Sequence, residues 1–250
     1  MNYASQGFRI WILAVLLVLP SLCHAADCEK ALHGWTTSSG QHEGGVVVRE
    51  GFWVNNPADP GGETYEGITI RDHKRWRGWA LINEAKKGLG DQPKFGTPAY
   101  RAWVKRLNQK LIANAELQKL VDDQYHGDQW EQIRGDEIIS QYLAYKLVRL
   151  GINMGTGTAI IILEKTINDL NGKDEDFPLH GVLTAGHVTW LNEFTAPEKL
   201  VDGTTSNWRR WCFFAQLKLN ALDRYGDLIA ARPKLGTFWE TWSEDAEHDR

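Results

Sequence analysis

The spacing of apolar residues predicts a mainly helical protein, and the clearest helical pattern lies in the C-terminal half. From Asp136 onward the apolar positions fall on one face of a helix, and Gly151 is expected to end that helix. A second, very apolar helix is predicted from Thr158 to Asn168, and Asn171-Gly172 is expected to close it.

Three further helical segments show recognisable start or break signals. Thr184 is predicted to cap one helix, and Ser206 is predicted to cap another that ends at Gly226. The segment from Pro98 to Leu120 has apolar residues at helical spacing, with a break expected near Asn114.

The N-terminal half has a less regular pattern. A short helix is expected between Asp27 and Arg49, although Val46 to Arg49 fits either a helix or a strand because valine favours strands. The stretch from Asn55 to Gly62 is rich in turn-forming residues, and Glu63 to Thr69 is predicted to form a strand of a hairpin. The pattern as a whole predicts a mainly α protein with one small β element.

Composition narrows the class of protein. The chain has 250 residues, which suits one large domain or two small ones, and 42% hydrophobic residues can build a real core. The mean hydropathy of −0.41 is typical of a water-soluble chain. A net charge of −4 does not suggest a nucleic-acid partner.

The first residues have the pattern of an export signal. Arg9 precedes an apolar run from Ile10 to Leu19, Pro20 ends that run, and the small residues Ala25 and Ala26 offer a cleavage point after Ala25. The apolar run is short for a membrane span. We therefore expect residues 1–25 to be a cleaved signal peptide and the protein to be periplasmic or extracellular, with an uncleaved anchor as the alternative.

Cysteine usage agrees with export. Cleavage would remove Cys23 and leave Cys28 and Cys212. In an oxidising compartment an even pair of cysteines predicts one disulfide, here between the N-terminal end of the mature chain and a C-terminal helix. Two unpaired thiols are the alternative.

One stretch, residues 50–69, combines the residue types that glycoside hydrolysis needs. Glu50 follows an apolar run and precedes two aromatic residues, Asp59 comes nine residues later in a loop of prolines and glycines, and Thr64 follows. The leaving oxygen needs a proton, and an apolar setting keeps a carboxylic acid protonated near neutral pH. The pattern predicts Glu50 as the general acid. Ionised Asp59 would orient a water or stabilise the oxocarbenium-like charge, and Thr64 would help to hold that water.

The chain holds twelve tryptophans, which is many for its length. Most are expected in the core, but a flat aromatic ring also stacks well on a sugar ring. Trp53 and Trp130 are candidates for a glycan-binding groove. Phe52 and Trp53 flank Glu50 and are predicted to form an aromatic wall that keeps Glu50 protonated, with burial of both in the core as the alternative.

The stretch resembles the signature of glycoside hydrolase family 108, the N-acetylmuramidases of phage endolysins and secretion-associated wall hydrolases. That signature is written roughly E-G-G-Y-V-N-D-P-x-D-P-G-G-x-T-x-x-G-I-T. The matching positions are Glu50, Gly51, Val54, Asn55, Pro57, Asp59, Pro60, Gly61, Gly62, Thr64, Gly67, Ile68 and Thr69. The resemblance implies that Glu50 is the catalytic acid.

The sequence also departs from the family pattern. Phe52 and Trp53 replace a glycine and a tyrosine, and Asn56 stands where the family usually has aspartate, which leaves Asp59 as the only acid of the loop. About 25 residues between Arg71 and Lys110 look like an insertion relative to the family. No role is predicted for them.

The resemblance also implies an architecture. It implies a lysozyme-like helical fold with a small β-hairpin beside the active site, in which residues 26–135 form the muramidase part. Residues 136–250 resemble the helical peptidoglycan-domain partner of this family and are expected to pack on the first part. Gly151 to Gly155 resembles the family's V-N-x-G helix start, which makes Asn153 a candidate substrate-binding residue.

The expected function is that of an N-acetyl-β-D-muramidase acting on peptidoglycan glycan strands as a monomer, without a cofactor. A lytic transglycosylase and a non-catalytic wall-binding or export-assisting protein remain alternatives. A zinc amidase is a weaker one, because no histidines occur in an HExxH pattern or at helical i, i+4 spacing. No metal site is therefore predicted.

Overall fold

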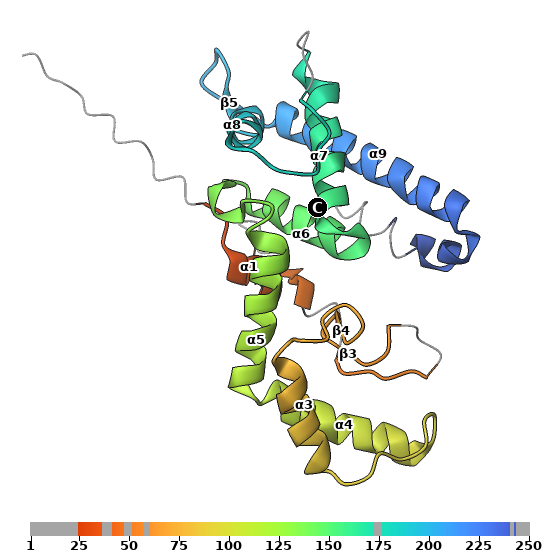
Figure 1. The fold of residues 1–250 in the computed structure, drawn as a ribbon. Coiled ribbons are helices and arrows are strands. Elements are labelled where there is room, and N and C mark those ends of the chain that lie inside the picture. The colour runs from red at the N-terminus through yellow and green to blue at the C-terminus, as the bar shows by residue number, and fades with distance from the viewer. Residues whose placement is uncertain are drawn as a thin grey trace, which may run out of the picture.

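The structure of the chain is a computed structural model that describes residues 25–36, 42–47, 52–57, 61–172, 177–240 and 243. Figure 1 shows α5 (Ala115–Tyr125) running between two groups of helices. One group holds α3 and α4, and the other holds α6, α7, α8 and α9. The three sheets that the described residues form have two strands each. The predicted mainly α, lysozyme-like class with a small hairpin is confirmed.

The N-terminal segment forms a short helix followed by a small antiparallel sheet. Helix α1 (Cys28–His33) is capped by the Asp27 side chain, which accepts a hydrogen bond from the backbone N–H of Lys30 at 3.3 Å. Strands β1 (Gly34–Thr36) and β2 (His42–Gly44) pair with Gly34 opposite Gly44. Val46 and Val47 are helical and buried. Of the two alternatives that the sequence left open, helix and strand, these two valines adopt the helix.

The hairpin predicted after the turn-rich loop is present. Strands β3 (Thr64–Tyr65) and β4 (Ile68–Thr69) pair antiparallel, with Tyr65 opposite Ile68. The two turn residues, Glu66 and Gly67, have φ values of 45° and 77°. A two-residue type I′ turn needs positive φ at both positions, and its twist matches that of the paired strands.

Three helices follow the hairpin. Helix α3 (Gly78–Lys87) lies in the stretch to which no role was assigned, and it packs on α4 (Pro98–Ile112). The break expected near Asn114 is confirmed, because α4 ends and α5 begins there. The Asn114 side chain accepts a hydrogen bond from the backbone N–H of Leu117 at 3.0 Å and so caps α5.

A π-helical turn (His126–Trp130) and a 3₁₀ turn (Gly135–Glu137) connect α5 to the C-terminal helices. Helix α6 (Gln141–Met154) packs on α7 (Thr156–Asn171), and α7 packs on both α8 (Ala185–Phe194) and α9 (Trp208–Ala231). Strands β5 (Glu198–Lys199) and β6 (Thr205–Ser206) form a small antiparallel pair, and a 3₁₀ helix (Pro233–Phe238) follows α9.

Several predicted helix ends are wrong, and the reasons differ. Helix α6 starts after Ser140 rather than at Asp136, and it continues through Gly151, which is buried. A side-chain carbon at Gly151 would lie 2.5 Å from Oε1 of Gln129, so this glycine permits a close contact instead of ending the helix. Helix α9 likewise continues past Gly226, which is exposed.

Two other helix boundaries were predicted well. Thr184 caps α8 in a reciprocal capping box, in which the His187 backbone N–H donates to the Thr184 hydroxyl and the Thr184 backbone N–H donates to the His187 ring. Helix α7 ends at Asn171, with Gly172 in the left-handed conformation as expected. The predicted cap at Ser206 is wrong by one residue, since Asn207 occupies that position and makes no side-chain capping bond.

The predicted disulfide between Cys28 and Cys212 is wrong, because both thiols are free in the structure. Cys28 is half-buried on α1, which packs on α6 and α5, whereas Cys212 is exposed on α9, which packs on α7. Counting cysteines gave an even number, but a disulfide also needs two Cα atoms within about 7 Å. None of the described helices is long and apolar enough to cross a membrane.

Candidate functional site

The two predicted catalytic carboxylates, Glu50 and Asp59, lie outside the described residues, so their roles stay predictions. The structure describes the segments that precede and follow them. Before Glu50, the helical residues Val46 and Val47 belong to the hydrophobic core. After it, residues 52–57 and the hairpin are described.

Residues 53–56, called the motif strand below, follow Glu50 in the sequence and join the hairpin through one isolated β-bridge at Val54. Val54 and Thr64 exchange both backbone hydrogen bonds, each at 2.9 Å. Phe52 is 55% exposed, Trp53 is 0% exposed and Val54 is 51% exposed. This alternation is the two-residue period of a strand with one face on the core. The Val54–Thr64 pair therefore fixes both ends of the loop that contains Asp59.

Trp53 is held in the core by several contacts. Its backbone N–H donates to Asn108 Oδ1 at 3.0 Å, and its indole N–H donates to Glu63 Oε1 at 2.5 Å. Its ring meets the ring of Trp103 edge-on, with the centroids 5.6 Å apart. Lys86 Nζ pairs with Glu63 at 2.7 Å and lies 5.6 Å from the centroid of the Trp53 ring. These contacts favour the core alternative for Trp53, whereas Phe52 remains available to solvent.

Thr64, the predicted water-holding residue, occupies the first position of β3 and is half-buried. Its hydroxyl donates to the Gly62 carbonyl at 3.4 Å. Gly62 has a φ of 75°, so the chain turns there into the hairpin in a conformation that favours glycine. The geometry ties Thr64 to the end of the Asp59 loop, while its role toward water stays a prediction.

Trp130 and Asn153, the other two predicted substrate-binding residues, have structural partners. Trp130 is buried, its indole N–H donates to Asp136 Oδ1 at 2.8 Å, and its ring lies directly over Gly135. Asn153 Nδ2 donates to the Tyr225 hydroxyl at 3.2 Å and thereby links α6 to α9. These two contacts involve neither Phe52 nor Trp53, and the substrate-binding roles of Trp130 and Asn153 stay predictions.

One buried acid near the hairpin, Glu66, was not predicted from the sequence. Glu66 is only 5% exposed, and its Oε2 has no hydrogen-bond partner among the described residues. Burial raises the pKa of its carboxyl to about 7, while a hydrogen bond with Tyr65 acts in the opposite direction. Its carbonyl accepts a hydrogen bond from the Tyr125 hydroxyl at 2.7 Å, which fixes the turn against α5. The Glu-Gly pair indicates a tight turn, but nothing in the sequence indicates burial of the acid.

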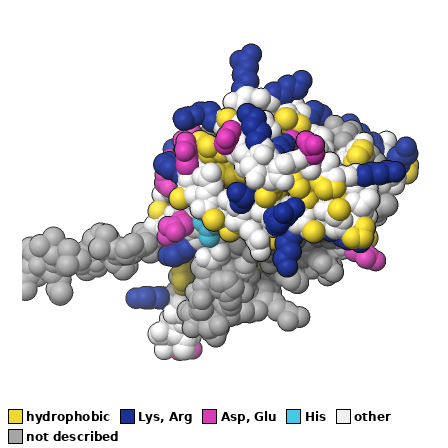
Figure 2. Space-filling model, turned by 90° about the horizontal axis from the view of Figure 1, so that it is seen from below, with side chains coloured by type: hydrophobic (Ala, Val, Ile, Leu, Met, Phe, Trp, Pro, Cys, Tyr) yellow, Lys and Arg dark blue, Asp and Glu magenta, His cyan; other side chains and the backbone are white. Residues whose placement is uncertain are grey.

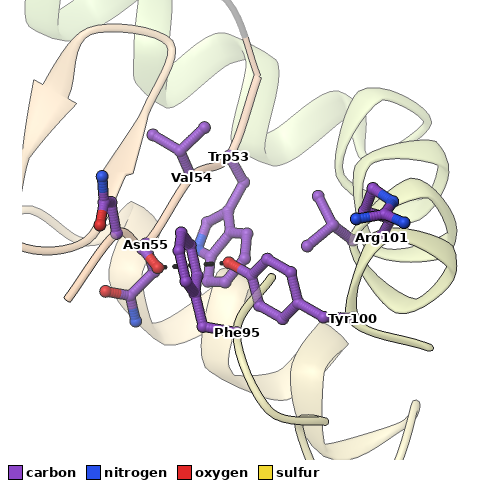
Figure 3. A pocket seen from close by; sticks show the side chains of 8 residues that line it. Trp53, Val54, Asn55, Phe95, Tyr100 and Arg101 are labelled. Carbon is purple, nitrogen blue, oxygen red and sulfur yellow. Dashed lines mark hydrogen bonds between the residues drawn. The ribbon is translucent and has the colours of Figure 1, made fainter. Parts of the chain in front are cut away.

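A pocket lies directly beside the motif strand (Figure 3). It has a volume of about 510 Å³ and is bounded by the strand Trp53–Asn56 on one side and by α4 and the turn before it on the other. The Tyr100 hydroxyl donates to the Asn55 carbonyl at 3.2 Å across it. Among the described residues no group of three or more His, Cys, Asp and Glu side chains is placed to hold a metal ion.

The motif lies in a part of the chain that matches the model of a known protein family. The family model described as glycosyl hydrolase 108 matches residues 44–155. A solved structure titled "Structure of Brucella abortus SagA" has 20% sequence identity and a TM-score of 0.44, covering 80% of this chain and 84% of that chain. No curated protein matches the chain. The family match confirms the predicted resemblance over residues 44–155 and supports a glycoside hydrolase that acts on peptidoglycan.

Proposed function

We propose that the protein is an N-acetylmuramidase that cleaves the bond between N-acetylmuramic acid and N-acetylglucosamine in peptidoglycan, with Glu50 as the general acid. The observation that carries the proposal is the family match, because residues 44–155 include the whole motif from Glu50 to Thr69. A glycoside hydrolase of this kind needs one protonated and one ionised carboxyl group at the bond that it cleaves.

The described residues that flank Glu50 in the sequence support its role as the acid. Val46 and Val47 before it and Trp53 after it are buried in the hydrophobic core. A catalytic acid needs apolar neighbours to keep the proton that it delivers, and buried residues at both ends of this short stretch fit that requirement. Exposed Phe52 next to it offers an aromatic face for a sugar ring.

The hairpin supports a positioning role for the loop that carries Asp59. The backbone pair between Val54 and Thr64 closes the loop at its base, and Arg71 N donates to the Gly61 carbonyl at 3.4 Å. A loop fixed at its base holds its side chains in a narrower range of positions, and catalysis depends on such preorganisation. Asp59 in this loop would remain ionised and orient water or stabilise the developing charge.

We also propose that the chain is exported and cleaved after Ala25. Ala25 is exposed, whereas Ala26 is buried and donates its backbone N–H to the Ile138 carbonyl at 2.7 Å. The neighbouring Asp27 N–H donates to Gln141 Oε1, also at 2.7 Å. The expected cleavage site therefore coincides with the point at which the chain joins the fold, at Ile138 and at the first residue of α6.

The decisive experiment for the bond is mass spectrometry of peptidoglycan digested by the protein from Ala26 onward. Reducing N-acetylmuramic acid ends are expected. Anhydro-muramic ends would identify a lytic transglycosylase instead, and released peptides without sugar would identify an amidase. An unchanged polymer that still retains the protein would indicate a non-catalytic wall-binding protein.

A further inference from the structure

The pocket beside the motif combines an apolar interior with a cation. Its walls come from Trp53 and Val54 of the motif strand and from Phe95 and Val104 on the α4 side. Figure 3 shows the aromatic rings of Phe95 and Tyr100 gathered beside Trp53. Phe95 and Tyr100 pack with their ring centroids 5.1 Å apart. The pocket can therefore take small apolar groups.

Arg101 supplies the cation. It lines the same pocket and is exposed, and its Nη1 donates to the Gly96 carbonyl at 2.9 Å. No ion pair joins Arg101 to an acid of the described chain. A guanidinium group has five N–H donors in a planar fork that matches a carboxylate. Most of these donors remain available for a ligand.

The stretch of sequence that contains Arg101 carries an excess of positive charge. The stretch from Arg71 to Lys110 holds eleven lysine and arginine residues and three acidic residues, in a chain whose net charge is −4. All eleven except Lys86 are exposed. The face that carries α3 and α4 is seen in Figure 2, where Lys and Arg side chains surround exposed hydrophobic ones. Such a face attracts an anionic partner.

We propose that this pocket binds the stem peptide of peptidoglycan, with Arg101 pairing with a stem carboxylate and the apolar walls enclosing small side chains such as those of alanine. The inference rests on the proposed function, because the stem is attached to the muramic acid that would bind along the motif. The pocket and the motif share the strand Trp53–Asn56, so a sugar beside exposed Phe52 and Val54 brings its stem to the pocket.

The assignment gives the stretch between Arg71 and Lys110 a role. Helix α4 and the turn before it supply Phe95, Tyr100, Arg101 and Val104, which together form one side of the pocket. The motif strand alone would leave this side open. Stem recognition is thus a property that α4 adds to the hydrolase motif.

The test compares binding of two soluble probes by calorimetry. One is the disaccharide N-acetylglucosaminyl-N-acetylmuramic acid with its stem peptide, and the other is the same disaccharide after an amidase has removed the stem. Neither contains the bond that a muramidase cleaves, so binding is measured without turnover. The wild-type protein should bind the stem-bearing probe at least about tenfold more tightly, since a charge-assisted carboxylate pair adds to apolar contact.

Two variants assign the preference to the pocket. Arg101→Ala should lose most of the preference for the stem-bearing probe, and Arg101→Lys should restore only part of it because lysine lacks the planar fork. Arg106→Ala is the matched control, because Arg106 is an exposed arginine on α4 that does not line the pocket. It should keep the preference. Melting temperatures would show that all three variants fold.

Equal binding of the two probes by the wild-type protein would overturn the inference, as would an Arg101→Ala variant that keeps the full preference. Vesicles of phosphatidylglycerol and phosphatidylcholine test the competing occupant. If Arg101→Ala reduced sedimentation with these vesicles but left muropeptide binding unchanged, the face would bind a membrane instead. Digests that lack reducing muramic ends would contradict the proposed function separately, because stem binding is measured without cleavage.

Discussion

At the scale of single residues, Phe52 and Trp53 are adjacent aromatic residues with opposite environments, one exposed and one buried. Trp53 is fully enclosed and hydrogen-bonded to Glu63, whereas more than half of the Phe52 side chain faces solvent. The sequence suggested one aromatic wall made of both residues. The burial of Trp53 favours the core alternative for that residue, because neighbouring side chains of an extended segment point to opposite faces.

Substitution of these two residues should therefore affect stability very differently. Trp53→Ala should lower the free energy of unfolding by about 3–5 kcal/mol, because it leaves a cavity in the core. Phe52→Ala should change it by no more than about 0.5 kcal/mol, as for an exposed side chain. Urea unfolding followed by fluorescence measures both. A small effect of Trp53→Ala would contradict its placement in the core.

Glu66 makes stability depend on pH through one buried carboxyl. Its pKa rises from an ordinary value of 4.5 to about 7 in the folded protein, mainly because burial disfavours the charged form. The folded state therefore binds a proton more tightly than the unfolded state does. The resulting stabilisation is fully present below pH 4.5 and is lost as pH rises through about 7.

Glu66→Gln should remove this dependence. The amide cannot ionise, so the stability of the variant should fall less than that of the wild type between pH 5 and pH 8, by on the order of 3 kcal/mol at most. Glu84→Gln, at an exposed position on α3, is the control and should leave the wild-type slope unchanged. The urea concentration at the midpoint of unfolding, measured for each protein across this pH range, tests the prediction. Identical slopes for wild type and Glu66→Gln would refute the buried, proton-retaining carboxyl.

At the scale of elements, the apolar period located most helices, while contacts between elements determined where they end. Gly151 has the chemistry of a helix end, yet it lies inside α6 because Gln129 approaches it closely. The apolar pattern begins at Asp136, but this stretch forms a 3₁₀ turn in which Gly135 packs under the Trp130 ring. Neither contact partner can be identified from local spacing.

The N-terminal cap of α8 is a helix end that could be predicted from the local sequence alone. Thr184→Ala removes the hydroxyl that accepts the His187 backbone N–H, and should destabilise the protein by about 1 kcal/mol. Thr189→Ala makes the same chemical change at an exposed position inside α8. There, alanine should be neutral or slightly stabilising because of its higher helix propensity. Thermal unfolding of the pair tests the cap, and equal effects would count against it.

At the scale of the whole molecule, the sequence predicted the class of fold and the family segment but not how distant parts meet. The motif between Glu50 and Thr69 was sufficient for the resemblance, which the family match over residues 44–155 confirms. The disulfide was wrong because the number of cysteines contains no information about distance. The pocket was missed because one of its sides is built by α4, in a stretch with no counterpart in the motif.

Glu50 and Glu66 are both glutamates of the motif sequence, and catalysis is assigned to only one of these two. The Glu66 carboxyl is buried, so a sugar cannot reach it. Glu50, which begins the family motif, is the proposed general acid. Glu66→Gln should therefore retain turnover, which makes it a matched control for Glu50→Gln.

The most direct test of the central claim is the rate at which purified peptidoglycan is solubilised by the wild type, by Glu50→Gln and by Glu66→Gln at the same pH. Glu50→Gln keeps the shape of the side chain but has no proton to deliver, so its rate should fall by roughly 10²–10⁴-fold with the melting temperature preserved. Glu66→Gln should stay close to the wild-type rate. A Glu50→Gln protein with near-wild-type turnover would contradict the account.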